Sequence, residues 1–237
     1  MHIGNEMPSK IIKFKDQSLQ VIIRDEADES VMREVFKFRE YRIAEDAIEE
    51  TTDPILDIGA HAGFFVMYTR LLNEKIKIFA VEPEKNNLTQ LKKHLEMNNI
   101  TGVEIVPGVL ANKTGEALLR ISIDSHNHEV VEEETGEGVC QKVRSYSLLD
   151  LLKKIKVKKV GLIKMDIEGG EFSIIESWND DEFALVKNVI LEYHNRRKDD
   201  YKQIENKFRK NGFSVRVFPS QFDKTMGFIF AHNKRLK

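Results

Sequence analysis

The most constraining feature of the sequence is a glycine-containing loop between a short apolar strand and a largely apolar helix. The strand is expected over 55–58, the loop reads Asp57-Ile58-Gly59-Ala60-His61-Ala62-Gly63, and the helix is expected over 64–72. Gly59 permits a tight turn directly after the strand, and Gly63 lets the helix pack close against it. Open α/β sheets bind nucleotides at this place. The segment therefore predicts an α/β sheet with a ligand site at the end of its first strand.

Strands and helices continue to alternate after this loop. Apolar runs predict strands, and the amphipathic segments between them predict helices. The expected strands cover 77–81, 103–106, 116–123, 160–165 and 189–192, and the expected helices cover 84–99, 147–155, 171–178 and 200–211. This alternation is typical of a parallel sheet with helices on both faces. A final pair of strands, 213–218 and 227–232, is joined by a short loop and is therefore expected to be antiparallel.

An N-terminal extension precedes this pattern. Residues 11–25 are expected to form two short strands around a turn, and one helix is expected from about Glu29 to Glu50. The apolar residues of this helix recur at roughly helical spacing: Val31, Val35, Phe38, Ile43 and Ile48. Pro54 ends the helix, because proline disfavours a helical conformation in the residue before it. We therefore expect the chain of 237 residues to hold an extension over 1–53 and one α/β domain over 54–237.

Charge and cysteine content favour an ordinary cytoplasmic enzyme. The chain has 37 Lys and Arg against 39 Asp and Glu, which gives a formal net charge of -2. A protein that binds phosphate backbones usually carries a positive excess, so a general nucleic-acid binder is disfavoured. Cys140 is the single cysteine, and no intramolecular disulfide can form. The sequence has no signal-peptide pattern and no run of ~20 apolar residues, which predicts a cytoplasmic protein without a membrane span.

Acidic residues follow the first two strands of the α/β region. Asp57 ends the first strand, where a dinucleotide site would bring glycines toward a pyrophosphate. A carboxylate there suits a cofactor with a positive charge and an amino acid moiety, such as S-adenosylmethionine. Glu82 ends the second strand, where a carboxylate can accept hydrogen bonds from both ribose hydroxyls of an adenosine. The expected cofactor-binding residues are Asp57, Gly59, Ala60, His61, Gly63, Glu82 and Pro83, with Val109 and Leu110 as a wall for the adenine.

Four motifs resemble the FkbM family of methyltransferases. They are the loop from Asp57 to Gly63, Glu82-Pro83 followed by Asn87 and Leu88, the segment Lys164-Met165-Asp166-Ile167-Glu168-Gly169-Gly170-Glu171, and Glu192-Tyr193-His194. The glycine loop is shared by many methyltransferases, whereas the third segment is much more specific. The resemblance implies a Rossmann-like class I methyltransferase sheet, mostly parallel with an antiparallel C-terminal strand. It also implies S-adenosyl-L-methionine as the methyl donor and, as in most of the family, a hydroxyl oxygen of a sugar, polyketide or other small molecule as the acceptor.

The candidate catalytic residues lie at and just beyond the ends of the fourth and fifth strands: Lys164, Asp166, Glu168, Glu192 and His194. Side chains two residues apart on a strand point to the same side, so Lys164 and Asp166 are expected together. Three arrangements stay open at this point. His194 would be a general base, Asp166 and Glu192 would hold a divalent cation that acidifies the acceptor hydroxyl, or Lys164 would act as a base or orient Asp166. Each residue also has a structural alternative, such as a Lys164–Asp166 pair or a carboxylate at a helix N-terminus.

Three other functions compete with this one. The intact set of Asp166, Glu168, Glu192 and His194 argues against a protein that binds the cofactor without catalysis. A nicotinamide-dependent oxidoreductase would have an apolar strand end and a G-x-G-x-x-G loop, whereas Asp57 occupies the strand end here. A nucleic-acid methyltransferase that modifies base amino groups would have an N/D-P-P-Y/F segment, which 164–169 lacks. The polar segment 124–138 contains two glycines and two histidines and is expected to be a mobile lid over the small-molecule or carbohydrate acceptor.

Overall fold

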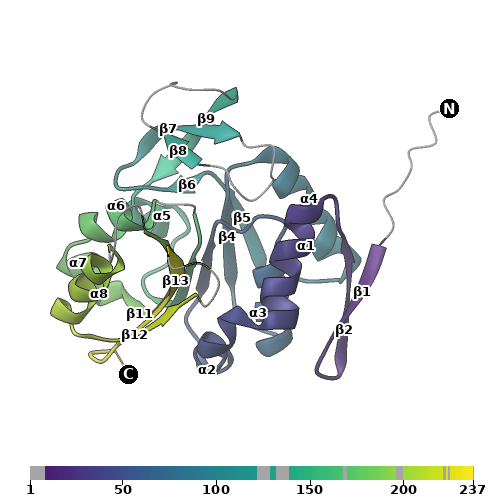
Figure 1. The fold of residues 1–237 in the computed structure, drawn as a ribbon, viewed down its shortest axis with the longest axis horizontal. Coiled ribbons are helices and arrows are strands. Elements are labelled where there is room, and N and C mark those ends of the chain that lie inside the picture. Colours follow the sequence, from purple (N-terminus) through teal and green to yellow (C-terminus); the bar gives the residue numbers. More distant parts are fainter. Residues whose placement is uncertain are drawn as a thin grey trace.

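The central sheet of the protein is mostly parallel (Figure 1). The computed structural model describes residues 9–121, 129–131, 139–167, 170–195, 200–220, 223 and 225–236. The strand order is β12-β13-β11-β10-β3-β4-β5, with β3 (Ile55–Ile58), β4 (Ile78–Glu82), β5 (Val103–Pro107), β10 (Val160–Met165), β11 (Val186–His194), β12 (Phe213–Pro219) and β13 (Met226–Asn233). β13 runs antiparallel to both of its neighbours, β11 and β12. These features confirm the expected α/β sheet with an antiparallel strand near the C-terminus.

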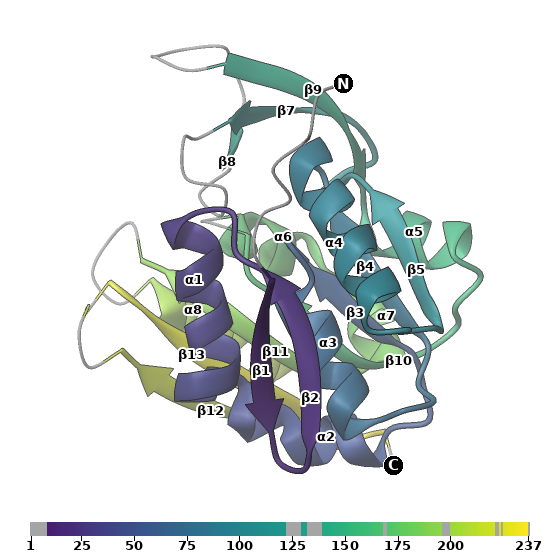
Figure 2. The same ribbon diagram turned by 90° about the vertical axis from the view of Figure 1, so that its right-hand side faces the viewer.

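Helices cover both faces of this sheet (Figure 2). On one face lie α3 (Phe64–Leu72), α4 (Lys85–Met97) and the N-terminal extension, and on the other lie α5 (Leu148–Lys154), α6 (Glu171–Ser177), α7 (Asp180–Leu185) and α8 (Tyr201–Lys210). Side chains alternate along each strand, so Leu56 and Ile58 pack toward α5–α8 whereas Ile55 packs toward α3. The sheet therefore has a separate apolar core on each side.

The N-terminal extension packs on the α3 face as a hairpin and a series of short helices. The hairpin is β1 (Ser9–Phe14) and β2 (Gln17–Ile22), and the helices are α1 (Glu26–Met32), the π-helix η1 (Arg33–Phe38), the 3-10 helix η2 (Glu40–Ala44) and α2 (Glu45–Glu50). The prediction of one helix from Glu29 to Glu50 is therefore wrong. Arg39 interrupts it with a left-handed φ of 53°, and the wider π turn before Arg39 changes the phase of the helix. As a result Phe36 is buried, whereas Phe38, expected on the apolar face, is 60% exposed.

A second, smaller sheet lies beyond the ends of β4 and β5 (Figure 1). Its described strands are β6 (Val109–Leu110), β9 (Val139–Tyr146), β7 (Gly115–Ile121) and β8 (Glu129–Val131), in that spatial order. β7 corresponds to the strand expected over 116–123. The expected lid over 124–138 includes β8, but 122–128 and 132–138 lie outside the described residues, so the lid stays a prediction.

The extension and the sheet share one of the two cores. Phe14 of β1 and Phe36 of η1 contact Tyr68 of α3 edge to face, with ring centroids 5.1 and 5.9 Å from that of Tyr68. The division into an extension over 1–53 and a domain over 54–237 stays a prediction. Among the helices of the described residues, none is long and apolar enough to cross a membrane. The cytoplasmic location likewise stays a prediction.

Candidate active site

The glycine loop connects β3 to α3 and is held by backbone contacts on both sides. The N–H groups of Gly59 and Ala60 both donate to the carbonyl oxygen of Val81 at 3.0 Å, which ties the loop to β4. Gly59 and Gly63 have left-handed φ values of 77° and 86°. A Cβ on Gly59 would lie 2.0 Å from the carbonyl oxygen of Asp166, just beyond β10. Only glycine therefore fits at position 59 of the loop.

Asp57 and Lys164 form a buried ion pair below the loop. Asp57 is 0% exposed, and its Oδ1 lies 3.5 Å from Lys164 Nζ. Lys164 Nζ also donates a hydrogen bond of 2.9 Å to the carbonyl oxygen of Gly59, so this side chain connects β10 to the loop. Burial raises the pKa of Asp57 to about 6, against the opposing effect of Lys164.

Lys164 lies among carboxylates and keeps its positive charge. Its Nζ is also 3.6 Å from Asp166 Oδ2. Burial acts to lower the pKa of Lys164, but the charges of Asp57 and Asp166 outweigh it, so the pKa is raised. A lysine that serves as a base needs a depressed pKa. The geometry favours the alternative in which Lys164 orients Asp166 and supports the glycine loop.

Glu82, the last residue of β4, is fixed by three donors. Its Oε2 accepts from the N–H of His61 at 2.8 Å, and its Oε1 accepts from the N–H of Glu84 at 2.9 Å and from Asn87 Nδ2 at 3.3 Å. Burial raises the pKa of Glu82 to about 7, although these hydrogen bonds act to lower it. A carboxylate oxygen can accept two hydrogen bonds. Oε2 therefore has the capacity to accept one more donor.

The remaining predicted cofactor residues surround the same strand ends. They are all buried or half-buried: Ala60, His61, Pro83, Val109 and Leu110. The N–H of Gly108 donates to the carbonyl oxygen of Glu82 at 3.1 Å, which brings β6 next to the end of β4. Val109 and Leu110, the predicted wall for the adenine, thus lie next to Glu82, the predicted acceptor for the ribose hydroxyls.

The buried polar groups of this region fit S-adenosylmethionine. Neither carboxylate oxygen of Asp57 has a hydrogen-bond partner among the described residues, and a buried carboxylate without such partners is costly in a protein. A positively charged ligand with N–H donors stabilises such a group. Glu82 offers the acceptor that a ribose hydroxyl needs, and the two acids lie on neighbouring strands.

Asp166, Glu192 and His194 lie together at the ends of β10 and β11. Each offers one carboxylate oxygen or imidazole nitrogen, and these atoms all lie within 4.8 Å of one another. The parallel pairing of Met165 with Leu191 places Asp166 opposite Glu192. Burial and the charge of Asp166 raise the pKa of Glu192 to about 9. The Glu192 carboxyl therefore keeps a proton at neutral pH and can donate a hydrogen bond.

A buried carboxylate also lies beside the imidazole of His194. Its Nδ1 lies 3.4 Å from Oε1 of Glu171, the first residue of α6, and Glu171 is 0% exposed. Glu171 Oε1 also accepts from the N–H of Ile167 at 3.3 Å. A carboxylate beside one imidazole nitrogen sets which nitrogen carries the proton. Glu168, the remaining predicted catalytic residue, lies outside the described residues.

Tyr41 joins this cluster from the N-terminal extension, and sequence reasoning did not select it. Its Oη donates to Asp166 Oδ2 at 3.4 Å, and Lys164 Nζ lies 5.9 Å from the centre of its ring. Burial and then the charge of Asp166 raise the pKa of Tyr41 well above its usual range, so it remains a hydrogen-bond donor. Its position depends on the helix break at Arg39, which the apolar periodicity does not reveal.

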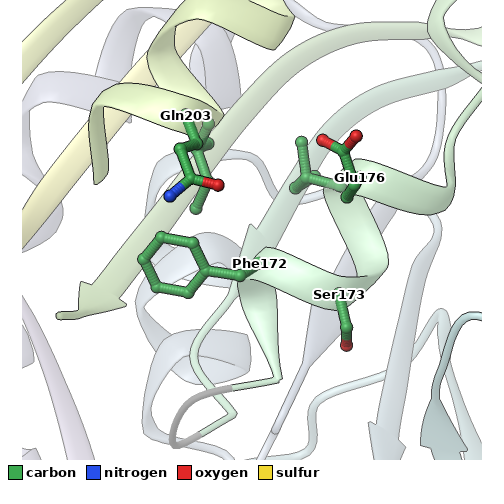
Figure 3. A pocket seen from close by; sticks show the side chains of 6 residues that line it. Phe172, Ser173, Glu176 and Gln203 are labelled. Atoms are coloured by element: carbon green, nitrogen blue, oxygen red, sulfur yellow. The ribbon is translucent and has the colours of Figure 1, made fainter. Parts of the chain in front are cut away.

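A separate pocket of 220 Å³ lies between α6 and α8 (Figure 3). Its lining residues are Phe172, Ser173, Ile175, Glu176, Gln203 and Ile204. None of them belongs to the candidate catalytic or cofactor residues. The candidate catalytic and cofactor residues come together at the strand ends and the glycine loop, away from this pocket.

Known proteins share these motifs. The family model for the methyltransferase FkbM domain matches residues 57–215, from the start of the glycine loop to a point beyond His194, and so covers more than half of the chain. The chain belongs to the FkbM methyltransferase family. This finding confirms the resemblance carried by the four motifs. It favours a methyltransferase over the nicotinamide-dependent oxidoreductase considered above.

Named relatives of this FkbM-family chain are also methyltransferases. Methyltransferase 1 of Beauveria bassiana is 24% identical over 185 residues, which cover 69% of this chain and 73% of the relative. Methyltransferase sdnD of Sordaria araneosa is 23% identical over 168 residues, which cover 58% of this chain and 65% of the relative. The match thus spans less than two thirds of the length of the second relative.

Solved structures share the fold at low sequence identity. An rRNA methylase from Streptococcus thermophilus has a TM-score of 0.53 and 9% identity, with 82% of this chain and 96% of that chain covered. The fibrillarin pre-rRNA processing protein of Methanococcus jannaschii has a TM-score of 0.52 and 14% identity, with 95% and 83% covered. The N-terminal domain of human METTL16 in complex with SAH has a TM-score of 0.50 and 16% identity, with 83% of this chain and 69% of that chain covered. These likenesses show that the FkbM-family chain has the class I methyltransferase fold.

Proposed function

We propose that this FkbM-family enzyme methylates a hydroxyl oxygen of a small molecule or carbohydrate, with S-adenosylmethionine as the donor. The main support is the cluster of Asp166, Glu192 and His194 beside the glycine loop, because oxygen methylation requires removal of the hydroxyl proton. When bound, S-adenosylmethionine supplies an electrophilic methyl group on a positively charged sulfur. Asp57, the glycine loop and Glu82 would hold it.

His194 is the proposed proton acceptor. Glu171 fixes its imidazole and stabilises the charge that it gains with the proton, since their atoms lie 3.4 Å apart. The protonated carboxyl of Glu192 donates a hydrogen bond to the acceptor oxygen and orients it. Asp166 is held in place by Lys164 and Tyr41. These residues work by positioning and by proton transfer, the two tasks that methyl transfer leaves to the protein.

A divalent cation is the alternative way to acidify the acceptor hydroxyl. The donor atoms of Asp166, Glu192 and His194 are close enough together to share one ion, and oxygen and nitrogen ligands suit several divalent metals. A bound cation would itself lower the pKa of Glu192 through its charge. We favour His194 as the base because the Glu171 carboxylate beside its imidazole stabilises the positive charge that a base gains.

Glu82→Ala is expected to weaken binding of S-adenosylhomocysteine by about 1–3 kcal/mol, or roughly 5- to 150-fold in Kd, because the ribose hydroxyl loses its acceptor. Isothermal titration calorimetry below the melting temperature measures this change. Glu104→Ala is the matched control, because it removes an exposed carboxylate of β5 that pairs with Lys77 at the surface, 3.3 Å away. Its Kd should equal that of the wild type. Equal Kd values for wild type and Glu82→Ala would remove Glu82 from the cofactor site.

A further inference from the structure

The N-terminal extension reaches the cofactor loop through a buried ion pair. Arg24, between β2 and α1, donates from Nε to Asp28 Oδ2 at 2.8 Å and from Nη2 to Asp28 Oδ1 at 2.6 Å. The side chain of Asp28 is 0% exposed and that of Arg24 is 15% exposed. Burial acts to raise the pKa of Asp28, but the hydrogen bonds from Arg24 outweigh it and the pKa is lowered. The pair is therefore ionised, bidentate and largely shielded from water.

Two series of contacts connect this pair to Glu82, one through Asn87 and one through His61. Arg24 Nη2 donates to Asn87 Oδ1 at 2.9 Å, and this contact turns the Asn87 amide so that Nδ2 donates to Glu82 Oε1. His61 Nε2 lies 3.3 Å from Arg24 Nη2 and 3.4 Å from Asp28 Oδ1, and the N–H of His61 donates to Glu82 Oε2. The two series thus end on different oxygens of the Glu82 carboxylate.

His61 is held in a backbone conformation that most residues avoid. Its φ is 48°, and the left-handed region costs a non-glycine residue about 1–2 kcal/mol. Such a conformation persists only where the surroundings determine it. The contacts of the imidazole with Arg24 and Asp28 offset this cost, and the left-handed turn directs the His61 N–H to Glu82.

The hairpin has other polar contacts with α4 that do not involve Glu82. At the far end of α4, Asn98 Oδ1 accepts from the N–H of Gln20 at 2.7 Å, and Asn98 Nδ2 donates to the carbonyl oxygen of Gln20 at 2.8 Å. Figure 2 shows the hairpin and α1 on the same face of the molecule as α3 and α4. Docking of the extension and orientation of Glu82 can therefore be changed separately by substitution.

We propose that Arg24 and Asp28 are positioning residues of the cofactor site. They fix His61 and Asn87, and through them the carboxylate of Glu82. This role rests on the proposed function, since it matters for ligand binding only where Glu82 accepts a ribose hydroxyl. It makes the extension, which precedes the family match at residue 57, part of the machinery that binds S-adenosylmethionine.

The test is the affinity of the double variant Arg24→Met/Asp28→Leu for S-adenosylhomocysteine, measured by calorimetry below the melting temperature. Removing both charges leaves neither one buried and unpaired, and apolar replacement of a buried ion pair often preserves stability. We expect Kd to rise about 10-fold, a coupling typical of residues in one hydrogen-bond network, at a melting temperature near that of the wild type. The control Asn98→Ala should lower the melting temperature and leave Kd unchanged.

A wild-type Kd in the double variant would overturn the positioning role and leave the proposed function intact. An equal rise of Kd in Asn98→Ala would also overturn it, because docking of the hairpin as a whole would then set the affinity. Absence of binding by the wild type would contradict the proposed function itself, and the positioning role with it. If the double variant does not fold, Arg24→Lys replaces it, since one ammonium group cannot reproduce the bidentate contact and also reach Asn87. Its Kd should rise, and an unchanged Kd would overturn the role.

Discussion

Gly59→Ala is expected to remove measurable binding of S-adenosylhomocysteine and to lower the free energy of unfolding by about 2–5 kcal/mol. The left-handed φ of 77° disfavours alanine, and its Cβ would lie 2.0 Å from the carbonyl oxygen of Asp166. That oxygen cannot move away easily, because the N–H of Asp166 donates to the carbonyl of Ile58 at 3.2 Å. The glycine loop must shift instead. Calorimetry and chemical denaturation measure the two effects.

Gly102→Ala separates the backbone cost of this substitution from the clash. Gly102 has a similar φ of 74°, but its Cβ would meet the end of the flexible Arg70 side chain at 3.1 Å. It precedes β5, at the opposite end of the strands from the glycine loop. We expect a loss of about 1–2 kcal/mol in stability and an unchanged Kd. Wild-type affinity in Gly59→Ala would show that the ligand does not bind at this loop.

His194→Ala is expected to lower the turnover number by ~10²–10⁴-fold, the range typical for loss of a general base. Its Kd for S-adenosylhomocysteine should stay at the wild-type value, because His194 lies at the end of β11 and the adenosine is assigned to β3, β4 and β6. An interaction made only as the methyl group moves changes turnover without changing the affinity of the ground state. Steady-state kinetics with a chelator present and absent, together with calorimetry, measure both quantities.

His232→Ala is the matched control for this substitution. His232 lies on β13 opposite Asn188, at the start of β11, and its Nδ1 is 2.8 Å from Asn188 Oδ1. It should keep wild-type turnover. Loss of turnover with chelator and a mild effect of His194→Ala would assign activation of the hydroxyl to a cation. Wild-type turnover in His194→Ala without chelator sensitivity would leave catalysis to positioning alone.

Much of the fold could be predicted from the sequence because it is encoded locally. Apolar runs and amphipathic segments after Pro54 give the alternating strands and helices, and the structure confirms the sheet. The N-terminal helices could not be predicted in the same way. Val35 and Phe38 fit a continuous helix, but the left-handed Arg39 and the π turn before it replace Phe38 by Phe36 in the core. Apolar spacing does not record such a change of phase.

The candidate site could be predicted only where it follows from strand order. Asp166, Glu192 and His194 come together because neighbouring parallel strands end at one edge of the sheet. Tyr41 and Arg24 reach this edge from a separate part of the chain, and their contacts depend on how the extension docks. No local pattern indicates such long-range contacts. From the sequence alone, the polar residues of the extension therefore cannot be distinguished from ordinary surface residues.

Transfer of an isotopically labelled methyl group tests the proposed activity most directly. Wild-type enzyme would be incubated with labelled S-adenosylmethionine and a panel of hydroxyl-bearing sugars and small molecules, and the products would be identified by mass spectrometry and NMR. We expect a labelled O-methyl ether that Gly59→Ala does not form and that His194→Ala forms much more slowly. Label on nitrogen, on carbon or on added RNA, with none on a hydroxyl oxygen, would contradict the assignment of this enzyme as an O-methyltransferase of small molecules.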